Sequence, residues 1–346
     1  MSTRPFIGAR AEDGVRKVIN GRLRKSGWVE SVIPYTGYGT TDHVRVLARV
    51  VLRPAAATTP FGSAAEEFLS QRGWRNFFTA PAQRAQVTVT VGGSSVQVRT
   101  DRGGYVDVRL QNHDLEAGWG EATITVGEES VSAAVQVVDE SVDFGIVSDI
   151  DDTILTTFLP RLFLAAWNTF VVTEEGRRAV PGMAELYRRM LDENPGSPII
   201  YVSTGAWNTH PFLTRFMARN GYPAGPLLLT DWGPTNTGWF RSGPEHKRRA
   251  LRELARDLPH VRWLLVGDDG QHDPSLYREF AELQPDKVRA IAIRQLTMAE
   301  QVLAHGTATV LEDDDDLAWH PDLAPEVRGK DGDELAGPLE ALLEEL

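Results

Sequence analysis

The stretch "FGIVSDIDDTILTT" (residues 144–157) leads an apolar run directly into a group of acids. Residues 144–147 form a short apolar segment of the kind found in strands that are buried on both faces. Asp149, Asp151 and Asp152 follow within five positions. Because like charges at this spacing repel one another, either a cation is bound at the end of this strand or the acids simply face solvent.

Composition limits the classes of protein that fit this chain. Its 346 residues are 42% hydrophobic and 24% charged, which is typical of a soluble globular protein with room for two domains. The net charge of −12 argues against a nucleic-acid partner, which would require a basic face. Cysteine is absent, so disulfides, thiolate metal sites and cysteine nucleophiles are excluded. Arginine supplies 31 of the 36 basic residues, which favours a bacterial genome rich in G and C.

The N-terminal residues bear on localisation. They lack the apolar core of a signal peptide, and no apolar run approaches the roughly 18 residues that a membrane span needs. We therefore expect a cytoplasmic protein. Residues 1–28 carry seven basic and two acidic side chains. They either form a basic amphipathic helix in peripheral contact with an anionic membrane, or a helix packed against its own domain.

The region that follows has a period of two. Short alternating runs between residues 42 and 140 are bounded by Gly, Asn or Asp, as in antiparallel strands. The segments "VGGSSV" and "VGEESV" read as hairpin turns. Residues 1–140 are therefore predicted to form a helix followed by a small antiparallel β-sandwich-like domain. This region shows no catalytic constellation.

Beyond residue 140 the pattern alternates between strands and helices. It predicts an α/β domain over residues 141–312, in which a parallel sheet is covered on both faces and ligands bind at the carboxyl ends of the strands. Residues 313–346 are acidic and rich in Pro and Gly, and we expect a largely disordered tail with at most a short terminal helix. The predicted strands are 144–148, 198–202, 226–229, 261–266, 288–293 and 307–311.

Polar side chains follow several of these strands. Ser203 and Thr204 come after the second strand, Asp268 and Asp269 come after the fourth, and Lys247 lies in the first turn of a predicted helix. The carboxyl ends of parallel strands meet at one edge of a sheet, so these groups should converge with the acids of residues 149–152. Acids alone would suit many cations. Acids with a hydroxyl and an ammonium indicate a phosphoryl group held between a metal ion and a positive charge.

This set of groups is suited to phosphoryl transfer. A carboxylate can attack phosphorus to form an aspartyl-phosphate, and a second acid two residues later can protonate the leaving alkoxide and then activate water. Mg²⁺ prefers oxygen ligands, and between Asp149 and Asp268 it would reduce their mutual repulsion. Lys247 and the Ser203 hydroxyl would share the phosphoryl oxygens.

Longer motifs carry a family resemblance. "DIDDT" (residues 149–153) has the Asp-x-Asp-x-Thr spacing of the haloacid dehalogenase superfamily. The segments "SDIDDTI", "YVSTGAWN", "DWGPTNTGWFRSGPEHK" and "GDDGQHDPSLYREF" resemble, more narrowly, the family named for the phosphatidate phosphatase catalytic domain of actin-patch proteins. The resemblance covers roughly residues 140 to 310. It implies a Rossmann-like sheet of the haloacid dehalogenase type with a minimal cap, and a Mg²⁺-dependent phosphatase of lipid metabolism that releases diacylglycerol from phosphatidate.

The resemblance also implies individual roles. Asp149 matches the nucleophile and Asp151 the general acid and base, so the catalytic set is these two residues with Ser203 and Lys247. The implied metal residues are Asp149, Asp151 and Asp268. The implied phosphate-binding residues are Ser203, Thr204 and Lys247.

For each of three other acids in these motifs, the sequence leaves two possible roles open. Asp152 either takes part in the chemistry or braces its own loop. Asp269 and Asp273 each either assist the metal or are solvated or cap a helix, and Asp273 before Pro274 fits a helix N-cap.

The apolar segment 154–170, "ILTTFLPRLFLAAWNTF", lies where this superfamily inserts a cap. It either lines a groove for acyl chains or packs a small flap against the core. A cap this short would leave the site open, which suits a bulky or membrane-borne substrate.

Three functions therefore compete. The first is a phosphatidate phosphatase, and the second is a phosphatase of a soluble phosphomonoester or a phosphoprotein, which the acidity of the chain favours. The third is a non-catalytic binding module. The sequence sets neither the natural substrate nor the oligomeric state.

Overall fold

The computed structural model of the chain describes residues 19–55, 80–157, 177–230, 243–270, 272–298, 300–301 and 324–345. It divides into two compact units. The first, the β unit, consists mainly of Met1–Asp139. The second, the α/β unit, consists mainly of Glu140–Gly205, Thr209–Leu229 and Gly243–Leu346, so the division lies next to the predicted domain boundary.

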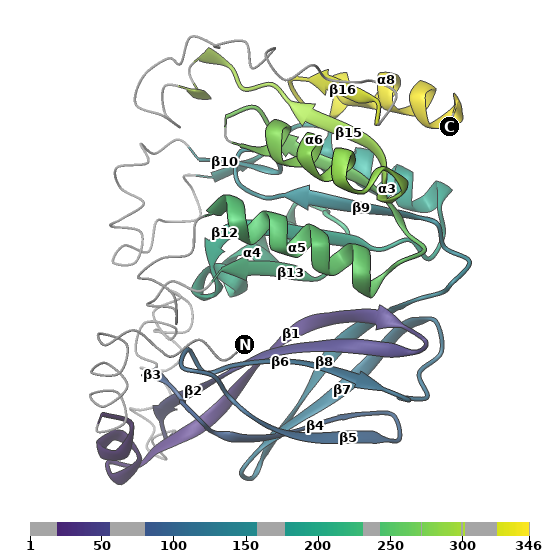
Figure 1. Cartoon of the computed structure of the whole chain (residues 1–346). Helices are drawn as coiled ribbons and strands as arrows, with labels where there is room; N and C mark the ends of the chain where they lie inside the picture. The colour runs from purple at the N-terminus through teal and green to yellow at the C-terminus, as the bar shows by residue number, and fades with distance from the viewer. Residues whose placement is uncertain are drawn as a thin grey trace. The chain divides into compact units, whose positions relative to one another are not determined.

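The described part of the β unit forms one eight-stranded sheet. The strand order is β3-β2-β1-β8-β7-β4-β5, and β6 pairs with β2. Because β5 also contacts β6, the sheet curls around a shared apolar core (Figure 1). The strands are β1 (Trp28–Thr40), β2 (His43–Pro54), β3 (Ala80–Pro81), β4 (Gln86–Val91), β5 (Ser94–Arg99), β6 (Tyr105–Gln111), β7 (Gly118–Val126) and β8 (Glu129–Val138).

Two expectations for this unit can be compared directly with the sheet. The predicted hairpin turns are confirmed, since Val91 pairs with Ser94 and Val126 pairs with Glu129 across two-residue loops. Strand β1 pairs antiparallel with β2 and parallel with β8, and the alternating pattern did not predict this parallel pair. A period of two reports which face a side chain occupies, and it is the same for parallel and antiparallel neighbours.

The described start of the chain is helical. Residues 19–25 form helical turns, and the Leu23 side chain packs against the core of the β unit. The Asn20 amide donates to the carbonyl oxygen of Pro81 at 2.9 Å. This end of the predicted basic helix therefore packs on its own domain, while residues 1–18 lie outside the described part of the chain.

The described α/β unit contains a six-stranded sheet of order β13-β12-β9-β14-β15-β16. Strand β9 lies in the interior of the sheet, with β12 and β14 paired in parallel on its two sides. Every residue of β9 is buried, as the unbroken apolar run predicts. The strands are β9 (Phe144–Asp149), β12 (Ile199–Ala206), β13 (Leu227–Thr230), β14 (Arg262–Asp268), β15 (Val288–Arg294) and β16 (Glu326–Gly329).

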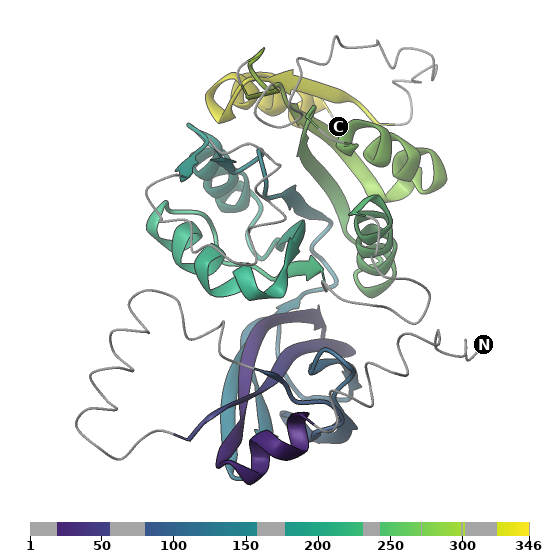
Figure 2. The same cartoon turned by 90° about the vertical axis from the view of Figure 1, so that its left-hand side faces the viewer.

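Helices cover both faces of this sheet. Figure 2 shows α5 (Gly243–Asp257) and α6 (Asp273–Leu283) on one side, and α3 (Met183–Glu193) and α4 (His210–Arg219) on the other. The chain therefore winds outward from β9 in one direction and then in the other, which creates a switch point at the carboxyl end of β9. No helix in the described ranges is long and apolar enough to cross a membrane.

Next to the site, a short antiparallel hairpin flanks the segment in which a cap was predicted. Strand β10 (Leu155–Thr157) pairs with β11 (Arg177–Ala179). Residues 158–176 lie outside the described part, so both interpretations of the apolar segment stay predictions. The strand predicted at 307–311 lies outside it as well.

The C-terminal region differs from its prediction. The expectation of a largely disordered tail is wrong for residues 324–345, where β16 adds a strand beside β15 and α8 (Gly332–Glu345) contacts α3. A side chain at Gly332 would collide with the backbone at Gly182, since its Cβ would lie 2.2 Å from the Gly182 carbonyl carbon. The composition of this segment did not predict the packing. The segment is acidic, and only a few of its apolar side chains face the core.

Replacing Leu335 with Ala tests whether α8 is part of the folded unit. The Leu335 side chain is fully buried, so we expect a loss of about 2–5 kcal/mol in the free energy of unfolding. The matched control is Leu283→Ala, because Leu283 is 70% exposed and should change stability by about 0.5 kcal/mol or less. Urea unfolding of both variants measures this. Equal effects would show that α8 is not packed against the unit.

Candidate active site

The first site residue, Asp149, ends β9 and begins a tight turn. The Ile154 amide donates to the Ile150 carbonyl at 3.1 Å, and the Asp152 amide donates to the Leu155 carbonyl at 2.8 Å. Asp152 has a φ of 60°, a left-handed conformation that Asp tolerates better than most residues. The turn thus bends the chain sharply just after the strand and holds the acids of the motif at the edge of the sheet.

A buried lysine reaches Asp149 from α5. The Lys247 side chain is 5% exposed, and its Nζ lies 2.7 Å from Asp149 Oδ1 and 2.5 Å from Asp273 Oδ1. Lys247 follows the start of α5 closely, as the sequence predicted. An ammonium group buried this deeply requires oppositely charged partners, and the carboxylates of Asp149 and Asp273 supply them.

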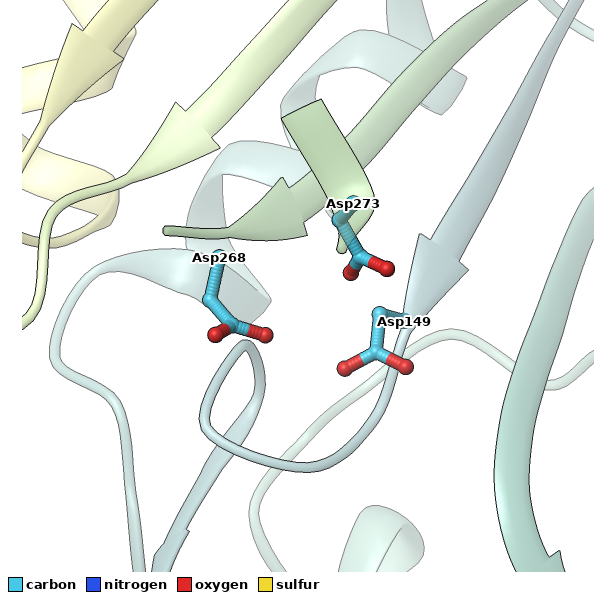
Figure 3. A group of neighbouring side chains, drawn as sticks. All are labelled: Asp149, Asp268 and Asp273. Carbon is cyan, nitrogen blue, oxygen red and sulfur yellow. The ribbon is translucent and has the colours of Figure 1, made fainter. Parts of the chain in front are cut away.

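Three carboxylates share this location. Asp149, Asp268 and Asp273 each offer one oxygen within 4.8 Å of the other two. Figure 3 shows them directed toward a common space from the end of β9, the end of β14 and the start of α6. Gly267 permits the approach of α6, because a Cβ there would lie 2.6 Å from Asp273 Oδ2. The switch point of the sheet thus concentrates negative charge.

Asp151 and Ser203 form a separate pair. Ser203 Oγ donates to Asp151 Oδ2 at 2.8 Å and accepts a hydrogen bond from the Gly205 amide at 2.8 Å. Ser203 is 1% exposed, and Thr204 follows it beside Gly243 at the start of α5. The structure therefore joins Asp149, Lys247 and Asp268 in one group, and directs the Asp151 carboxylate to the predicted phosphate-binding hydroxyl.

Asp152, Asp269 and Asp273, for which the sequence left two interpretations open, make different contacts in the structure. Asp273 does not act as the N-cap of α6, since His272 holds that position and the Asp273 side chain binds Lys247. Asp269 accepts a hydrogen bond from the Leu296 amide at 2.8 Å, which is a structural role. The Asp152 carbonyl is bound by a buried arginine, Arg294, at 2.7 Å.

Burial dominates the protonation of this group. It raises the pKa of Asp149 from 3.8 to about 8, although Lys247 opposes the change, and Asp273 and Asp151 add repulsion. Burial also raises the pKa of Asp268 well above its usual value. For Lys247, burial alone would lower the pKa, but Asp149 and Asp273 outweigh it, so the ammonium stays charged. Without a metal ion, retained protons on Asp149 and Asp268 therefore reduce the negative charge of this group.

The donor set fits a divalent cation. Carboxylate oxygens are the ligands that Mg²⁺ prefers, and if all three carboxyl groups are ionised the one ammonium leaves two negative charges for a cation to balance. Asp273 Oδ2 is buried and has no hydrogen-bond partner among the described residues, which is costly unless a cation or water satisfies it. Asp149 and Asp268 were predicted metal residues. The third carboxylate of the cluster is that of Asp273, whereas Asp151, which was also a predicted metal residue, accepts a hydrogen bond from Ser203.

Sequence reasoning missed several neighbours of the site. Tyr187 Oη lies 2.7 Å from Ser148 Oγ, which also donates to the Asp149 carbonyl at 2.7 Å. Arg177, on β11, interacts electrostatically with Asp151, and burial lowers the pKa of its guanidinium to about 10. Tyr187 lies within an amphipathic helix and Arg177 lies beyond the apolar segment, so neither had a local signal that linked it to the acids.

Residues 144–295 match the family described as the catalytic domain of phosphatidate phosphatase APP1. The predicted family is therefore confirmed for this segment. Phosphatidate phosphatase APP1 of Saccharomyces cerevisiae is 27% identical over 151 residues, which are 43% of this chain and 25% of the yeast protein. An uncharacterized protein of Schizosaccharomyces pombe is 25% identical over 163 residues, which are 47% of this chain and 26% of that protein.

The APP1-type match concerns one part of each relative. The chain spans about a quarter of the length of both curated proteins. The solved structure of a carbohydrate acetylesterase from Xanthomonas citri aligns over 80% of this chain and 74% of its own, at 12% identity and a TM-score of 0.27, a likeness too weak to inform fold or function.

The raised pKa of Asp149 predicts how pH acts on the metal-free protein. Between about pH 4 and 8 the folded state keeps a proton on Asp149 that the unfolded state releases, so stability falls as pH rises through this range. Asn cannot ionise, and Asp149→Asn should therefore make this fall shallower. Urea unfolding in a chelator across this range measures the slope.

The control for this pH series is Asp143→Asn, in which the replaced side chain is 73% exposed. It should follow the wild-type slope. An unchanged slope in Asp149→Asn would mean that burial does not hold the proton on this carboxyl group.

Proposed function

We propose that the chain is a Mg²⁺-dependent phosphomonoester hydrolase that converts phosphatidate to diacylglycerol and phosphate through an aspartyl-phosphate. The observation that carries this proposal is the buried contact of Asp149 with Lys247 beside Asp268, within a segment that matches a phosphatidate phosphatase catalytic domain. A nucleophilic carboxylate, an ammonium and a cation-binding carboxylate are the groups that phosphoryl transfer requires.

The first half-reaction uses the two aspartates at positions 149 and 151. A carboxylate oxygen of Asp149 attacks phosphorus, and the bond from phosphorus to the glycerol oxygen breaks. Asp151 gives its proton to that departing oxygen, which leaves as the hydroxyl of diacylglycerol. Lys247 and the Ser203 hydroxyl hold the phosphoryl oxygens, and this role is supported by their positions beside Asp149 and Asp151 respectively.

The second half-reaction returns the enzyme to its starting state. Asp151, now ionised, takes a proton from water as the water oxygen attacks phosphorus. The bond between phosphorus and Asp149 breaks, which frees phosphate and restores the carboxylate. Asp151 thus serves as acid and then as base, and its hydrogen bond to Ser203 keeps it near the phosphoryl group in both steps.

Asp149 and Asp268, with Asp273 beside them, would hold the Mg²⁺ ion. When bound, the ion supplies the positive charge that lets an anionic nucleophile approach an anionic phosphate ester. The order of strands around β9 and the site at its carboxyl end further support assignment to the haloacid dehalogenase class, which we include in the proposal.

Two observations bear on the substrate. The family match supports phosphatidate. A substrate of this kind would require a cytoplasmic enzyme to meet the membrane peripherally, and we assign that contact to the basic residues 1–28. The net charge of −12 favours a soluble phosphomonoester or phosphoprotein instead, because anionic vesicles repel an acidic surface. A non-catalytic binding module is the third candidate, and the complete set of acids with Lys247 argues against it.

A substrate panel with Asp149→Asn tests the function. Wild-type protein with Mg²⁺ should release phosphate from phosphatidate vesicles faster than from lysophosphatidate, glycerol 3-phosphate or a phosphoserine peptide. Asp149→Asn should reduce the rate to background, since an amide cannot serve as the nucleophile. The control Asp143→Asn changes an exposed acid six positions earlier and should keep wild-type activity.

The panel separates the candidates. Faster turnover of a soluble ester than of phosphatidate would show that the substrate belongs to the soluble class instead. Turnover that survives in Asp149→Asn would overturn the mechanism, and no turnover of any ester by wild-type protein would support the binding module.

Replacing Asp151 with Asn tests the proton transfer. Rates with phosphatidate should fall by about 10²–10⁴-fold, because an alkoxide leaves poorly without a proton. With p-nitrophenyl phosphate the formation of the aspartyl-phosphate should lose far less, since nitrophenolate leaves unprotonated. A burst of nitrophenolate followed by slow turnover is the expected signature in rapid-mixing experiments. An equal loss of the first step with both substrates would contradict an acid role for Asp151.

A further inference from the structure

Arg294 ends β15 and is nearly fully buried, with a side chain that is 5% exposed. All three of its guanidinium nitrogens donate hydrogen bonds. Nη1 donates to the Asp152 carbonyl at 2.7 Å, Nη2 to Glu300 Oε1 at 2.6 Å, and Nε to the Lys330 carbonyl at 2.9 Å. One side chain thus joins the turn after β9 to two segments that lie far away in the sequence.

The contact with Asp152 falls at the most constrained point of that turn. Asp152 has a φ of 60°, and it separates the proposed acid Asp151 from Thr153. Thr153 Oγ1 lies 3.3 Å from Asp149 Oδ2 and 3.5 Å from Asp268 Oδ2. A donor fixed on the Asp152 carbonyl therefore restrains the backbone directly after Asp151, in the same turn that begins at Asp149.

Hydrogen bonds to Glu300 and to the Lys330 carbonyl hold the Arg294 guanidinium group in one position. Burial by itself would raise the pKa of Glu300, but hydrogen bonds from Arg294 and Thr297 lower it, so Glu300 carries its charge opposite the guanidinium. A buried arginine whose three nitrogens each donate a hydrogen bond loses little further entropy in holding any one acceptor. Removal of this arginine would leave Glu300 Oε1 and the two carbonyls without the hydrogen bond that it donates to each.

The C-terminal segment completes the arrangement. Strand β16 is held beside β15 by the hydrogen bond from the Gln295 amide to the Gly329 carbonyl at 2.8 Å. Arg278 of α6 binds both carboxylate oxygens of Glu326, at 2.9 and 3.0 Å. These contacts place the Lys330 carbonyl where Arg294 meets it. Residues 324–345 lie beyond residue 295, where the family match ends.

We propose that Arg294 is a positioning residue of the site, and that the C-terminal segment serves the chemistry by holding it. Arg294 clamps the turn at Asp152 and so fixes the Asp151 carboxyl group relative to Asp149. This inference rests on the proposed phosphatase function for its consequence in turnover, but the clamp itself is a property of the turn that exists without substrate.

Hydrogen exchange and kinetics of Arg294 variants test the proposal. In Arg294→Met, the amides of residues 150–155 should exchange at least about 10-fold faster, because the turn loses its external donor. The kcat for phosphate release should fall by about 10- to 100-fold while KM changes less than about threefold, since a displaced acid slows the reaction but leaves phosphate binding in place. Arg294→Lys keeps one charged donor and should recover part of both effects.

Arg278→Met is the matched control. It removes a partly buried arginine, 16% exposed, that binds the same C-terminal strand through Glu326. We expect this variant to lose stability while exchange at residues 150–155 and kcat stay within about twofold of wild type. A kcat loss as large as that of Arg294→Met would reduce Arg294 to a general stabilising role.

The two readouts separate this inference from the proposed function. If wild-type protein turns over no phosphate ester, the function fails, and the exchange data alone decide whether Arg294 clamps the turn. If folded Arg294→Met shows wild-type exchange at residues 150–155, the clamp is wrong whatever the activity. Should Arg294→Met not fold, as judged by near-ultraviolet circular dichroism, Arg294→Lys decides by the same criteria.

Discussion

Burial of like charges is the constraint on which the α/β unit depends. One oxygen from each of three carboxylates lies within 4.8 Å of the other two, next to the carboxyl ends of buried strands. The Lys247 ammonium contacts two of the three carboxylates. In water these acids would separate, but each is fixed to the end of a strand or the start of a helix whose apolar residues are packed in the core. Hydrophobic burial elsewhere in the unit therefore sustains a local arrangement that is unfavourable without a cation.

The constraint explains how the elements around the site are built. Gly267 leaves room for Asp273, and the turn after β9 uses a left-handed Asp152 to bend the chain at once. Each feature brings polar groups closer than a regular strand or helix end would. A strained backbone conformation persists when several neighbouring contacts hold it in place. Arg294 provides one such contact for this turn, through its hydrogen bond to the Asp152 carbonyl.

The α/β unit is also larger than the segment that matches the family. The family match ends at residue 295, whereas β16 and α8 extend the sheet and its helical cover. The buried pair of Arg278 and Glu326 connects β16 to α6, the helix that carries Asp273. The segment is therefore tied to a site element by packing, although it contributes no carboxylate to the cluster. An added strand at a sheet edge can stabilise a site without altering its chemistry.

The sequence by itself determined the location of the candidate site and most of the sheet that carries it. The apolar run before Asp149 and the short spacing of the acids predicted a buried strand that ends in charge, and similar patterns placed Ser203, Lys247 and Asp268 at neighbouring element ends. These features are local, since period and spacing within a few residues suffice to predict them. The family resemblance added roles, which remain proposals.

Tertiary structure decided which of these groups meet. It brought Asp273 to Lys247 rather than to the cap of its own helix, directed Asp151 to Ser203, paired β1 with β8 in parallel, and packed the acidic C-terminal segment as β16 and α8. Arg294 and Asp152 are 142 positions apart, and no local pattern links them. Such contacts depend on the order of strands and on the packing between helices, which arise from the burial of the whole chain and not from any short stretch of it.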